Sequence, residues 1–341
     1  MTVTATRTYP ATRAYRTRVT RIDPLSEHFV RFTLADEDLQ FFGTGGLDQR
    51  IKLMIPRADG SLPDVGLFED PAPPMMEWYQ RWRSLSEEER NPMRTYTVRA
   101  VRPAEREIDV DFVLHGTDGP ASAWASTAAV GDELVVIGPD ERSETGGRGR
   151  SGGIEWDPGE ATTLLMAGDE TAAPAICAIL ETLDERYSGH VYIEVPTAQD
   201  TLPVHTRASV QLQWLPRDDR PQGEALTEAL RSWGRDHGAA VAGTGVVIAT
   251  GRPDGGGAGA VAGIGAGTEA AVAIEAEAEA ESEAPLWDVP TEGPHGRWYA
   301  WLAGEAGAIT SIRRHLVKDL GIDRKCVSFM GYWKQGRAEG S

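Results

Sequence analysis

The sequence predicts a chain of two domains, an antiparallel Greek-key β-barrel followed by a Rossmann-like α/β domain. Its 341 residues are enough for two domains of ordinary size. Up to about residue 140, short alternating or apolar runs are separated by turn residues, as in antiparallel β-structure. From residue 161 strands alternate with helical segments, which indicates a mostly parallel sheet with helices on both faces. We therefore expect domains at 1–145 and 161–341, joined by a linker at 146–160.

Six strands are expected in the barrel, each bounded by residues that favour turns, such as Asp23-Pro24 and Gly131-Asp132. A long excursion at 57–92 lies between the third and fourth strands. It contains a short helical segment at 75–82, whose aromatic residues are expected to pack rather than to bind a ligand. The six expected strands are 13–22, 27–34, 49–55, 94–101, 107–114 and 133–137.

The second domain opens with a buried strand at 163–167, after a linker rich in Gly, Arg, Ser and Glu. Asp169 is expected to cap the following helix, which carries Pro174 in its first turn and runs to about residue 186. No Gly-x-Gly-x-x-Gly follows the first strand, so the usual dinucleotide-binding fingerprint is missing. The other expected strands are 191–195, 211–215, 297–302 and 326–330, and the other expected helices are 224–233 and 305–320.

One internal segment, 251–290, differs in composition from the rest of the second domain. It opens with a glycine-rich run, and its later part alternates Ala and Glu. Such a composition buries too little apolar surface to offset the entropy lost on ordering. We therefore expect a disordered insert at this place.

Composition excludes several classes of protein. The formal net charge of −18 argues against sequence-independent nucleic-acid binding, because phosphates would be repelled. With only Cys177 and Cys326, the chain cannot supply the ligands of an iron–sulfur cluster or a zinc ribbon, or build a disulfide framework. It has no apolar run of about 18 residues, and residues 1–21 lack the apolar core of a secretory signal. We expect a cytoplasmic protein without membrane insertion, and take a monomer as the default.

The first candidate binding motif is Arg94-Thr95-Tyr96-Thr97, which runs directly into a strand through Val98. Side chains alternate along a strand, so Arg94 and Tyr96 point the same way. Arg forms charge-assisted bonds to phosphate and Tyr offers a flat ring, so the pair suits a ligand with a phosphate and an aromatic ring system. Thr97 points to the other face, where its hydroxyl or N–H can reach a ring edge. An exposed edge strand would show the same residue types, so this motif needs support from others.

The second motif, at 111–125, is a strand end followed by a Gly-rich turn and a short helix. Backbone N–H groups at such a helix start bind anions, diphosphates above all, and Ser122 adds a hydroxyl donor. His115 ends the strand, where it can hydrogen-bond or stack on a ligand ring. The alternatives are a structural role for His115 and a place in the core for Trp124.

Two further motifs lie in the second domain. Small residues at 167–174 occupy the strand-to-helix crossover where α/β sheets bind ligands, and Thr171 there can hydrogen-bond a ring edge. An ordinary capped helix is the alternative. Tyr332 and Trp333 follow the final strand with cations behind them, a combination that covers a ring and steers anions. A packed tail is the alternative.

Taken together, the four motifs resemble those of the siderophore-interacting protein family, FAD-containing ferric-siderophore reductases of the ferredoxin-reductase-like group. The resemblance covers nearly the whole chain apart from 251–290. The family's Arg-x-Tyr-(Ser/Thr) motif corresponds to 94–97, its strand-turn pattern to 111–124, its Gly-Asp-Glu-Thr-Ala pattern to 168–172, its Gly-Glu-Ala pattern to 304–306 and its terminal Tyr-Trp to 332–333.

The resemblance implies a reductase that binds FAD in the barrel and converts siderophore-bound Fe(III) to Fe(II). Iron is then released, because Fe²⁺ is held far more weakly than Fe³⁺ by anionic oxygen donors. The electron donor is expected to be NADH, NADPH or reduced ferredoxin, and no side chain is expected to act as a general acid or base. Glu194, at the end of a strand in the second domain, is placed to contact a ribose hydroxyl, which would favour NADH.

The resemblance also assigns residues to the site, with no resident metal. A general NAD(P)H-dependent flavin reductase or diaphorase and a non-catalytic siderophore carrier are the alternative functions. The ferric siderophore is expected to contact Lys52, which resembles a lysine at this place in the family, together with Lys334 and Arg337. The FAD cofactor is expected to contact Arg94, Tyr96, Thr97, Val98, Asp111, Val113, His115, Gly119, Ala121, Ser122, Trp124, Asp169, Thr171, Ala172, Tyr332 and Trp333.

Overall fold

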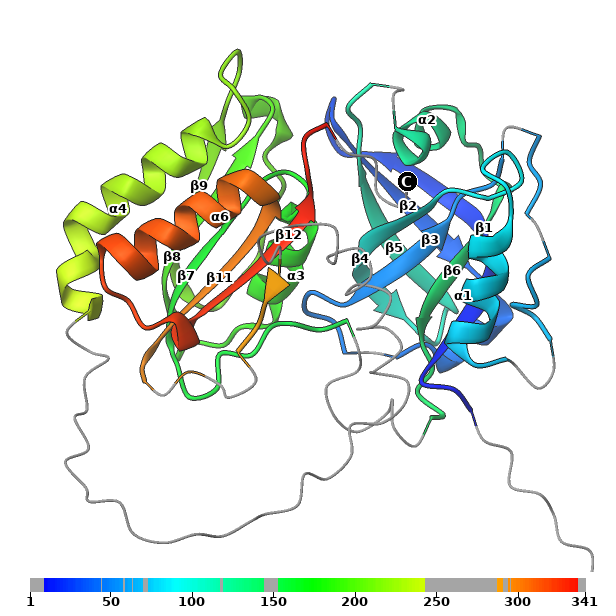
Figure 1. Cartoon of the computed structure of the whole chain (residues 1–341), viewed down its shortest axis with the longest axis horizontal. Helices are drawn as coiled ribbons and strands as arrows, with labels where there is room; N and C mark the ends of the chain where they lie inside the picture. The colour runs from blue at the N-terminus through cyan, green and yellow to red at the C-terminus, as the bar shows by residue number, and fades with distance from the viewer. Residues whose placement is uncertain are drawn as a thin grey trace, which may run out of the picture.

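The chain folds into a closed β-barrel and a six-stranded sheet covered by helices, which lie beside each other (Figure 1). This arrangement confirms the predicted fold class. The computed structural model describes residues 9–43, 45–57, 59–62, 64–69, 73–116, 119–143, 153–242, 287–290, 294 and 296–336.

The barrel consists of six antiparallel strands in the order β1-β2-β5-β4-β3-β6. Strands β3, β4 and β5 are consecutive neighbours and β6 returns to pair with β3, which is the Greek-key arrangement. Every expected strand of this domain is present, with ends shifted by no more than two residues. The strands are β1 (Thr12–Pro24), β2 (Phe29–Ala35), β3 (Arg50–Met54), β4 (Met93–Arg102), β5 (Glu107–Val113) and β6 (Glu133–Pro139), with a 3₁₀ turn, η1 (Glu37–Phe41), after β2.

The barrel interior is filled by alternate apolar residues of its strands, among them Phe32, Val110 and Phe112, which are fully buried. Helix α2 (Pro120–Thr127) lies over one end of the barrel (Figure 1). Its Trp124 ring packs on Phe32 and Phe112, with centroid separations of 5.1 and 5.6 Å. Trp124 is thus part of the packing that closes this end of the barrel.

The excursion between β3 and β4 folds against the outside of the barrel. Its helix α1 (Met75–Ser84) buries Trp78 and Trp82 in a cluster with apolar residues of β1, β3 and β6. The indole N–H of Trp82 donates to the carbonyl of Asn91 at 3.1 Å. The expected packing role of these aromatic residues is therefore confirmed.

The sheet of the second domain has the strand order β10-β12-β11-β7-β8-β9, and its strands are parallel except for β10. Helix α3 (Ala173–Thr182) covers one face, and α4 (Glu224–Ala242) and α6 (Ala306–Arg314) cover the other. The strands are β7 (Thr163–Gly168), β8 (Ser188–Val195), β9 (Ser209–Pro216), β10 (Trp287–Asp288), β11 (Trp298–Glu305) and β12 (Val327–Trp333), with short turns η2 (Ala198–Asp200), η3 (His315–Asp319) and η4 (Arg324–Cys326).

Several local expectations about this domain need correction. Helix α3 ends at Thr182 rather than at about residue 186, because Leu183 takes an extended conformation. Helix α4 continues to Ala242 rather than ending at 233, because Gly234 and Gly238 let it pack closely on Leu320. The helix expected at 305–320 ends at Arg314 and continues as the π-helical turn η3. Strand β12 includes Tyr332 and Trp333, so these aromatics do not follow the strand.

The expected insert at 251–290 needs correction at its end. Residues 287 and 288 at its end form β10, which pairs with β12 at the edge of the sheet. Residues 251–286 lie outside the described residues, so the expectation of disorder stays a prediction. The linker expected at 146–160 also carries defined contacts where the structure describes it, since the Glu155 and Trp156 N–H groups donate to the Asp48 carboxylate.

The two domains share a packed interface. Phe29 and Val113 of the barrel belong to the same buried cluster as residues of α3 and β7. Arg99 of β4 forms a two-pronged ion pair with Glu181 of α3, with distances of 2.6 and 2.8 Å. The Asp48 carboxylate accepts the Trp301 indole N–H at 3.3 Å. These contacts hold the second domain against the barrel.

Across the part of the chain that the structure describes, no helix is both long and apolar enough to pass through a membrane.

Candidate functional site

The motif on β4 presents Arg94 and Tyr96 on one face of the strand, as the alternation predicts. They lie opposite Leu53 and Ile51 of β3, which point into the barrel core. The Tyr96 ring packs on Phe112 with a centroid separation of 4.3 Å. The Arg94 guanidinium donates to the Met93 carbonyl at 2.9 Å. A cation and an aromatic ring thus lie on the same face of β4, and the ring packs on Phe112.

The next two residues of the motif face different surroundings. Thr97 points away from the barrel interior and is almost fully buried. Val98 lies inside the barrel core, and its N–H donates to the Gln49 carbonyl at 2.9 Å. Neither the side chain nor the N–H of Val98 is therefore available for the predicted contact with the cofactor.

The start of α2 has the geometry expected of an anion site. Gly119 is its N-cap and contributes no capping side chain, and Pro120 is the first residue of the helix. A Cβ at position 119 would lie 3.3 Å from the His115 ring, so a glycine leaves the space between the ring and the helix start open. Backbone N–H groups in the first turn of a helix are left without intrahelical partners and attract phosphate. This end of the helix fits the diphosphate of FAD.

Ser122 plays a different part from the one expected. Its hydroxyl donates to the Gly116 carbonyl at 2.6 Å and accepts the His115 N–H at 3.2 Å. The side chain therefore holds the turn before α2 rather than pointing outward as a donor. His115 is exposed beside this turn, whereas Ala121 is buried under the helix.

Asp111 and Val113 lie on the outer face of β5, toward the second domain. Both carboxylate oxygens of Asp111 accept bonds from Arg31, at 2.6 and 2.9 Å. Val113 is buried in the cluster shared with α3. The structure gives these two side chains roles in the domain interface, which corrects the expectation that they line the cofactor site. Phe112 lies between them and points inward, beneath Tyr96. The sequence analysis did not assign it to the site, although strand alternation alone would have indicated its direction.

The second half of the site is built around Asp169, directly after β7. Its side chain is fully enclosed and accepts the N–H and hydroxyl of Thr171, at 2.9 and 2.6 Å. It also accepts the Glu305 N–H at 2.7 Å and the Trp333 indole N–H at 2.8 Å. The N-cap of α3 is Ala172, so Asp169 binds the turn before the helix and does not cap the helix itself. Burial, and secondarily the Glu170 carboxylate, raise the pKa of Asp169 to about 6.

The other residues predicted in this half are placed unequally. Thr171 is half-buried at the crossover, whereas Ala172 is fully buried and packs against Gly168. Trp333 is half-buried at the end of β12. The Tyr332 ring stacks on Trp287 at 6.1 Å, and burial near Asp48 raises the pKa of its hydroxyl far above the usual value. Trp333 is therefore the member of the aromatic pair that is better placed for a ligand.

A chain of ring contacts joins β12 to the motif strand. Arg50 lies opposite Thr97 in the β3–β4 pairing, and its guanidinium stands 4.1 Å above the Trp287 ring. Trp287 in turn stacks on Tyr332, the neighbour of Trp333. The face of β3 and β4 that carries Arg50 and Thr97 thus lies beside β10 and the end of β12, whereas Arg94 and Tyr96 lie on the other face of β4. Sequence reasoning missed Arg50 and Trp287, since no local pattern connects positions so far apart.

Glu194 does not have the role that the sequence suggested. Its side chain is fully buried, and its oxygens accept the Gly223 and Leu226 N–H groups at 2.7 and 2.9 Å. It therefore binds the start of α4 and is not available to a ribose. The predicted preference for NADH loses its only structural support.

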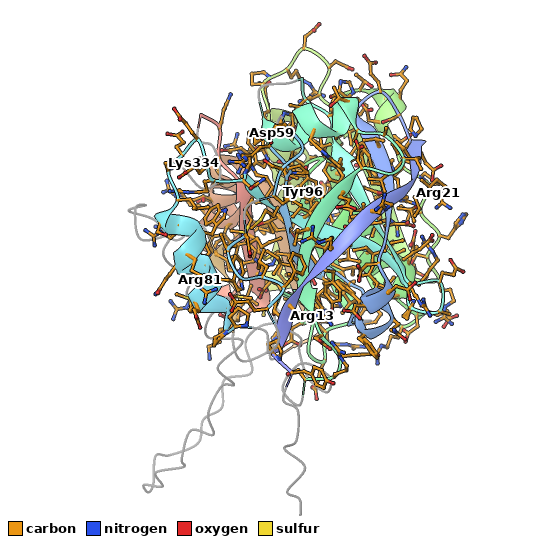
Figure 2. The ribbon with its side chains drawn as sticks, turned by 90° about the vertical axis from the view of Figure 1, so that its right-hand side faces the viewer. Arg13, Arg21, Asp59, Arg81, Tyr96 and Lys334 are labelled. Atoms are coloured by element: carbon orange, nitrogen blue, oxygen red, sulfur yellow. The ribbon has the colours of Figure 1, made fainter. Side chains whose placement is uncertain are left out.

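The predicted siderophore contacts lie on both domains. Lys52 of β3 donates to the Thr95 hydroxyl at 2.6 Å, on the strand face opposite to Tyr96. Lys334 is exposed just after β12, and Figure 2 shows it projecting at the edge of the view while Tyr96 lies near the centre. Arg337 lies outside the described residues. Among the described residues, no group of three or more His, Cys, Asp or Glu side chains is arranged to hold a metal ion.

Comparisons with known proteins match both domains. The model of the siderophore-interacting FAD-binding domain matches residues 18–143, and that of the siderophore-interacting protein matches residues 161–336. The chain belongs to the siderophore-interacting protein family. Its first domain is therefore an FAD-binding domain.

Individual relatives agree with this assignment. Ferric vibriobactin reductase ViuB of Vibrio cholerae is 30% identical over 206 residues, which cover 60% of this chain and 68% of ViuB. The crystal structure of the siderophore-interacting protein SipS from Aeromonas hydrophila has a TM-score of 0.60 at 25% identity, covering 97% of this chain and 95% of that one. A ferredoxin reductase in carbazole 1,9a-dioxygenase has a TM-score of 0.51 at 12% identity, covering 94% of this chain and 70% of that one. The last comparison shows that this siderophore-interacting protein shares the ferredoxin-reductase-like fold.

Proposed function

We propose that this siderophore-interacting protein is an FAD-dependent reductase that converts siderophore-bound Fe(III) to Fe(II). The observation that carries the proposal is the pairing of an FAD-binding domain with a siderophore-interacting domain in a chain 30% identical to a ferric vibriobactin reductase. Fe³⁺ is a hard cation held by anionic oxygen donors, and Fe²⁺ is held far more weakly. One-electron reduction therefore releases the iron without chemical damage to the siderophore.

The residues that fit FAD lie in two groups. Arg94 and the first turn of α2 offer a guanidinium and backbone N–H groups to the two phosphates. Tyr96 offers a ring face to the isoalloxazine from the barrel side, and Trp333 with Thr171 approach from the second domain. Bound FAD supplies the capacity to take two electrons as hydride and to release them one at a time. One hydride would therefore suffice for two ferric complexes.

The substrate is an anionic chelate, so it needs cations near the exposed edge of the cofactor. Lys52 and Lys334 supply these from the barrel and from the end of β12, and Arg337 follows in the chain. Because electron transfer depends on proximity and potential, no general acid or base is required. Protons that the released siderophore takes up come from water.

The electron donor is NADH, NADPH or reduced ferredoxin, consistent with the ferredoxin-reductase-like fold. The Gly-x-Gly-x-x-Gly fingerprint is missing after the first strand of the second domain, and the Glu194 side chain is bound to the start of α4. Neither feature therefore favours NADH over NADPH. We further propose that the protein acts as a monomer in the cytoplasm. A general flavin reductase and a non-catalytic siderophore carrier are the competing functions.

One experiment separates these functions. The purified protein is examined by absorption spectroscopy, then reduced anaerobically with each nicotinamide or with reduced ferredoxin, and mixed with a panel of ferric siderophores. The proposal expects a bound flavin spectrum that bleaches with the donor and recovers with the ferric chelate, while a ferrous chelator reports one Fe(II) per electron. Faster reduction of free flavin than of any chelate would favour the flavin reductase. A colourless protein that still binds chelate would favour the carrier.

A further inference from the structure

Asp169 joins the carboxyl ends of three parallel strands. It follows β7 directly, it accepts the N–H of Glu305 at the end of β11, and it accepts the indole N–H of Trp333 at the end of β12. Its other oxygen accepts both donors of Thr171. Each carboxylate oxygen therefore has two donors, which is a full complement for a buried carboxylate.

The chain makes room for this carboxylate at a specific place. Gly304 has φ +144°, a backbone conformation that favours glycine, and a Cβ there would lie 2.8 Å from the Asp169 carboxyl carbon. Only a glycine lets the end of β11 approach Asp169 so closely. Glu305 is itself occupied elsewhere, because its side chain accepts the Ala308 N–H and caps α6. Asp169 is thus the group that holds the Trp333 indole.

This contact fixes the indole in a way that packing does not. Trp333 is only half-buried, and it ends a strand after which the described residues 334–336 are exposed. Its neighbour Tyr332 is held by rings, stacked on Trp287 and edge-on to Trp301 at 6.4 Å. For Trp333 the described restraint is a 2.8 Å bond to a charged acceptor, and such bonds are short and directional.

We infer that Asp169 is a positioning residue for the flavin: it fixes the Trp333 indole, which would cover the isoalloxazine of FAD when the cofactor is bound. The inference rests on the proposed function, since it takes FAD binding at the seam between the domains as given. Asp169 acts through the indole and does not touch the cofactor itself.

A double-mutant cycle on the FAD-loaded protein tests this inference. Asp169→Ala removes the acceptor, Trp333→Phe removes the indole N–H but keeps a ring, and the double variant removes both. We expect each single variant to weaken FAD binding about 10-fold and to raise flavin fluorescence, because the ring that covers the isoalloxazine is loosened. The double variant is expected to bind FAD within about twofold of the weaker single variant, since one interaction is lost only once.

The matched control is Asp48→Asn. Asp48 is also a buried carboxylate that accepts two backbone N–H groups and an indole N–H, that of Trp301. We expect its replacement to lower the unfolding temperature and to leave flavin fluorescence unchanged. If Asp48→Asn alters flavin fluorescence as much as Asp169→Ala does, the role of Asp169 is merely structural and the inference is overturned.

Two further outcomes would also overturn it: effects of Asp169→Ala and Trp333→Phe that multiply in the double variant, or an Asp169→Ala protein with unchanged FAD affinity and fluorescence. If Asp169→Ala does not fold, Asp169→Asn takes its place in the cycle, because it keeps the side-chain size and removes one of the two acceptor atoms. A wild-type protein that binds FAD but reduces no ferric siderophore would overturn the proposed function alone, and the cycle would still decide the role of Asp169.

Discussion

Replacing Arg94 by Ala removes the cation that the proposal places on the phosphates of FAD. A hydrogen bond to a charged group contributes about 1.5–3 kcal/mol, which corresponds to a loss of roughly 10- to 150-fold in affinity. The structure favours the upper half of this range. The Arg94 guanidinium is half-buried and already donates to the Met93 carbonyl at 2.9 Å, so little side-chain freedom remains to be lost on binding. We expect the dissociation constant of FAD to rise by about 30- to 150-fold in Arg94→Ala.

The assay is equilibrium titration of the flavin-free variant with FAD, followed by absorption or fluorescence. Arg21→Ala is the matched control, because it removes the same charge from the barrel. Arg21 lies on β1, which does not neighbour β4, and its exposed side chain forms an ion pair with Asp23 on the same strand. We expect this control to change FAD affinity by less than about twofold, as for an exposed ion pair. Equal losses in the two variants, or an unchanged constant in Arg94→Ala, would refute the placement of FAD on the β4 motif.

Three other changes have defined outcomes. Burial raises the pKa of Asp48 to about 6, above its value of about 3.9 in an unfolded chain, so its contribution to stability is greatest at low pH and is lost as pH rises through 6. Urea unfolding at pH 4 and pH 8 should therefore show the free energy of wild type falling by about 2–3 kcal/mol relative to Asp48→Asn, and an equal pH dependence in both would contradict this. Gly304→Ala would place a Cβ in close contact at a positive φ, and we expect it to lower the free energy of unfolding by about 2–4 kcal/mol. The control Gly321→Ala has a positive φ in open space and should lower it by about 1 kcal/mol. Comparable losses in the two variants would show that the contact at Gly304 is easily relieved. Lys52→Ala should raise the KM for ferric siderophore about fivefold at unchanged FAD content, as expected for one partly exposed cation. The control Lys318→Ala, in η3 after α6, should leave the KM unchanged. An unchanged KM in both variants would remove Lys52 from the site.

Much of the architecture was predictable from local patterns. Alternating runs between turn residues located the six barrel strands, because the period of two and the turn chemistry are both short-range properties. The order of motifs along the chain likewise indicated the family. The shared face of Arg94 and Tyr96 followed from alternation and is present in the structure. Their contacts with FAD stay predictions.

Other residues were misjudged because the sequence does not reveal their partners. Asp111 was expected at the cofactor, yet Arg31 on the neighbouring strand takes both of its oxygens. Ser122 was expected to donate outward, yet it closes the turn at Gly116. Glu194 was expected at a ribose, yet the start of α4 takes it. In each case the residue type was informative, and the buried partner decided what it does.

The sequence by itself determined most strands and helices, their order and the family, because periodicity, turn residues and motif spacing act over a few positions of the chain. Only the tertiary structure decided which polar side chains face the seam between the domains. The bond between Asp169 and Trp333 joins positions separated by 164 residues, and that between Asp48 and Trp301 joins positions separated by 253. Such pairings depend on how distant parts of the chain pack together. A buried carboxylate must be hydrogen-bonded, so it accepts bonds from whichever donors packing places next to it.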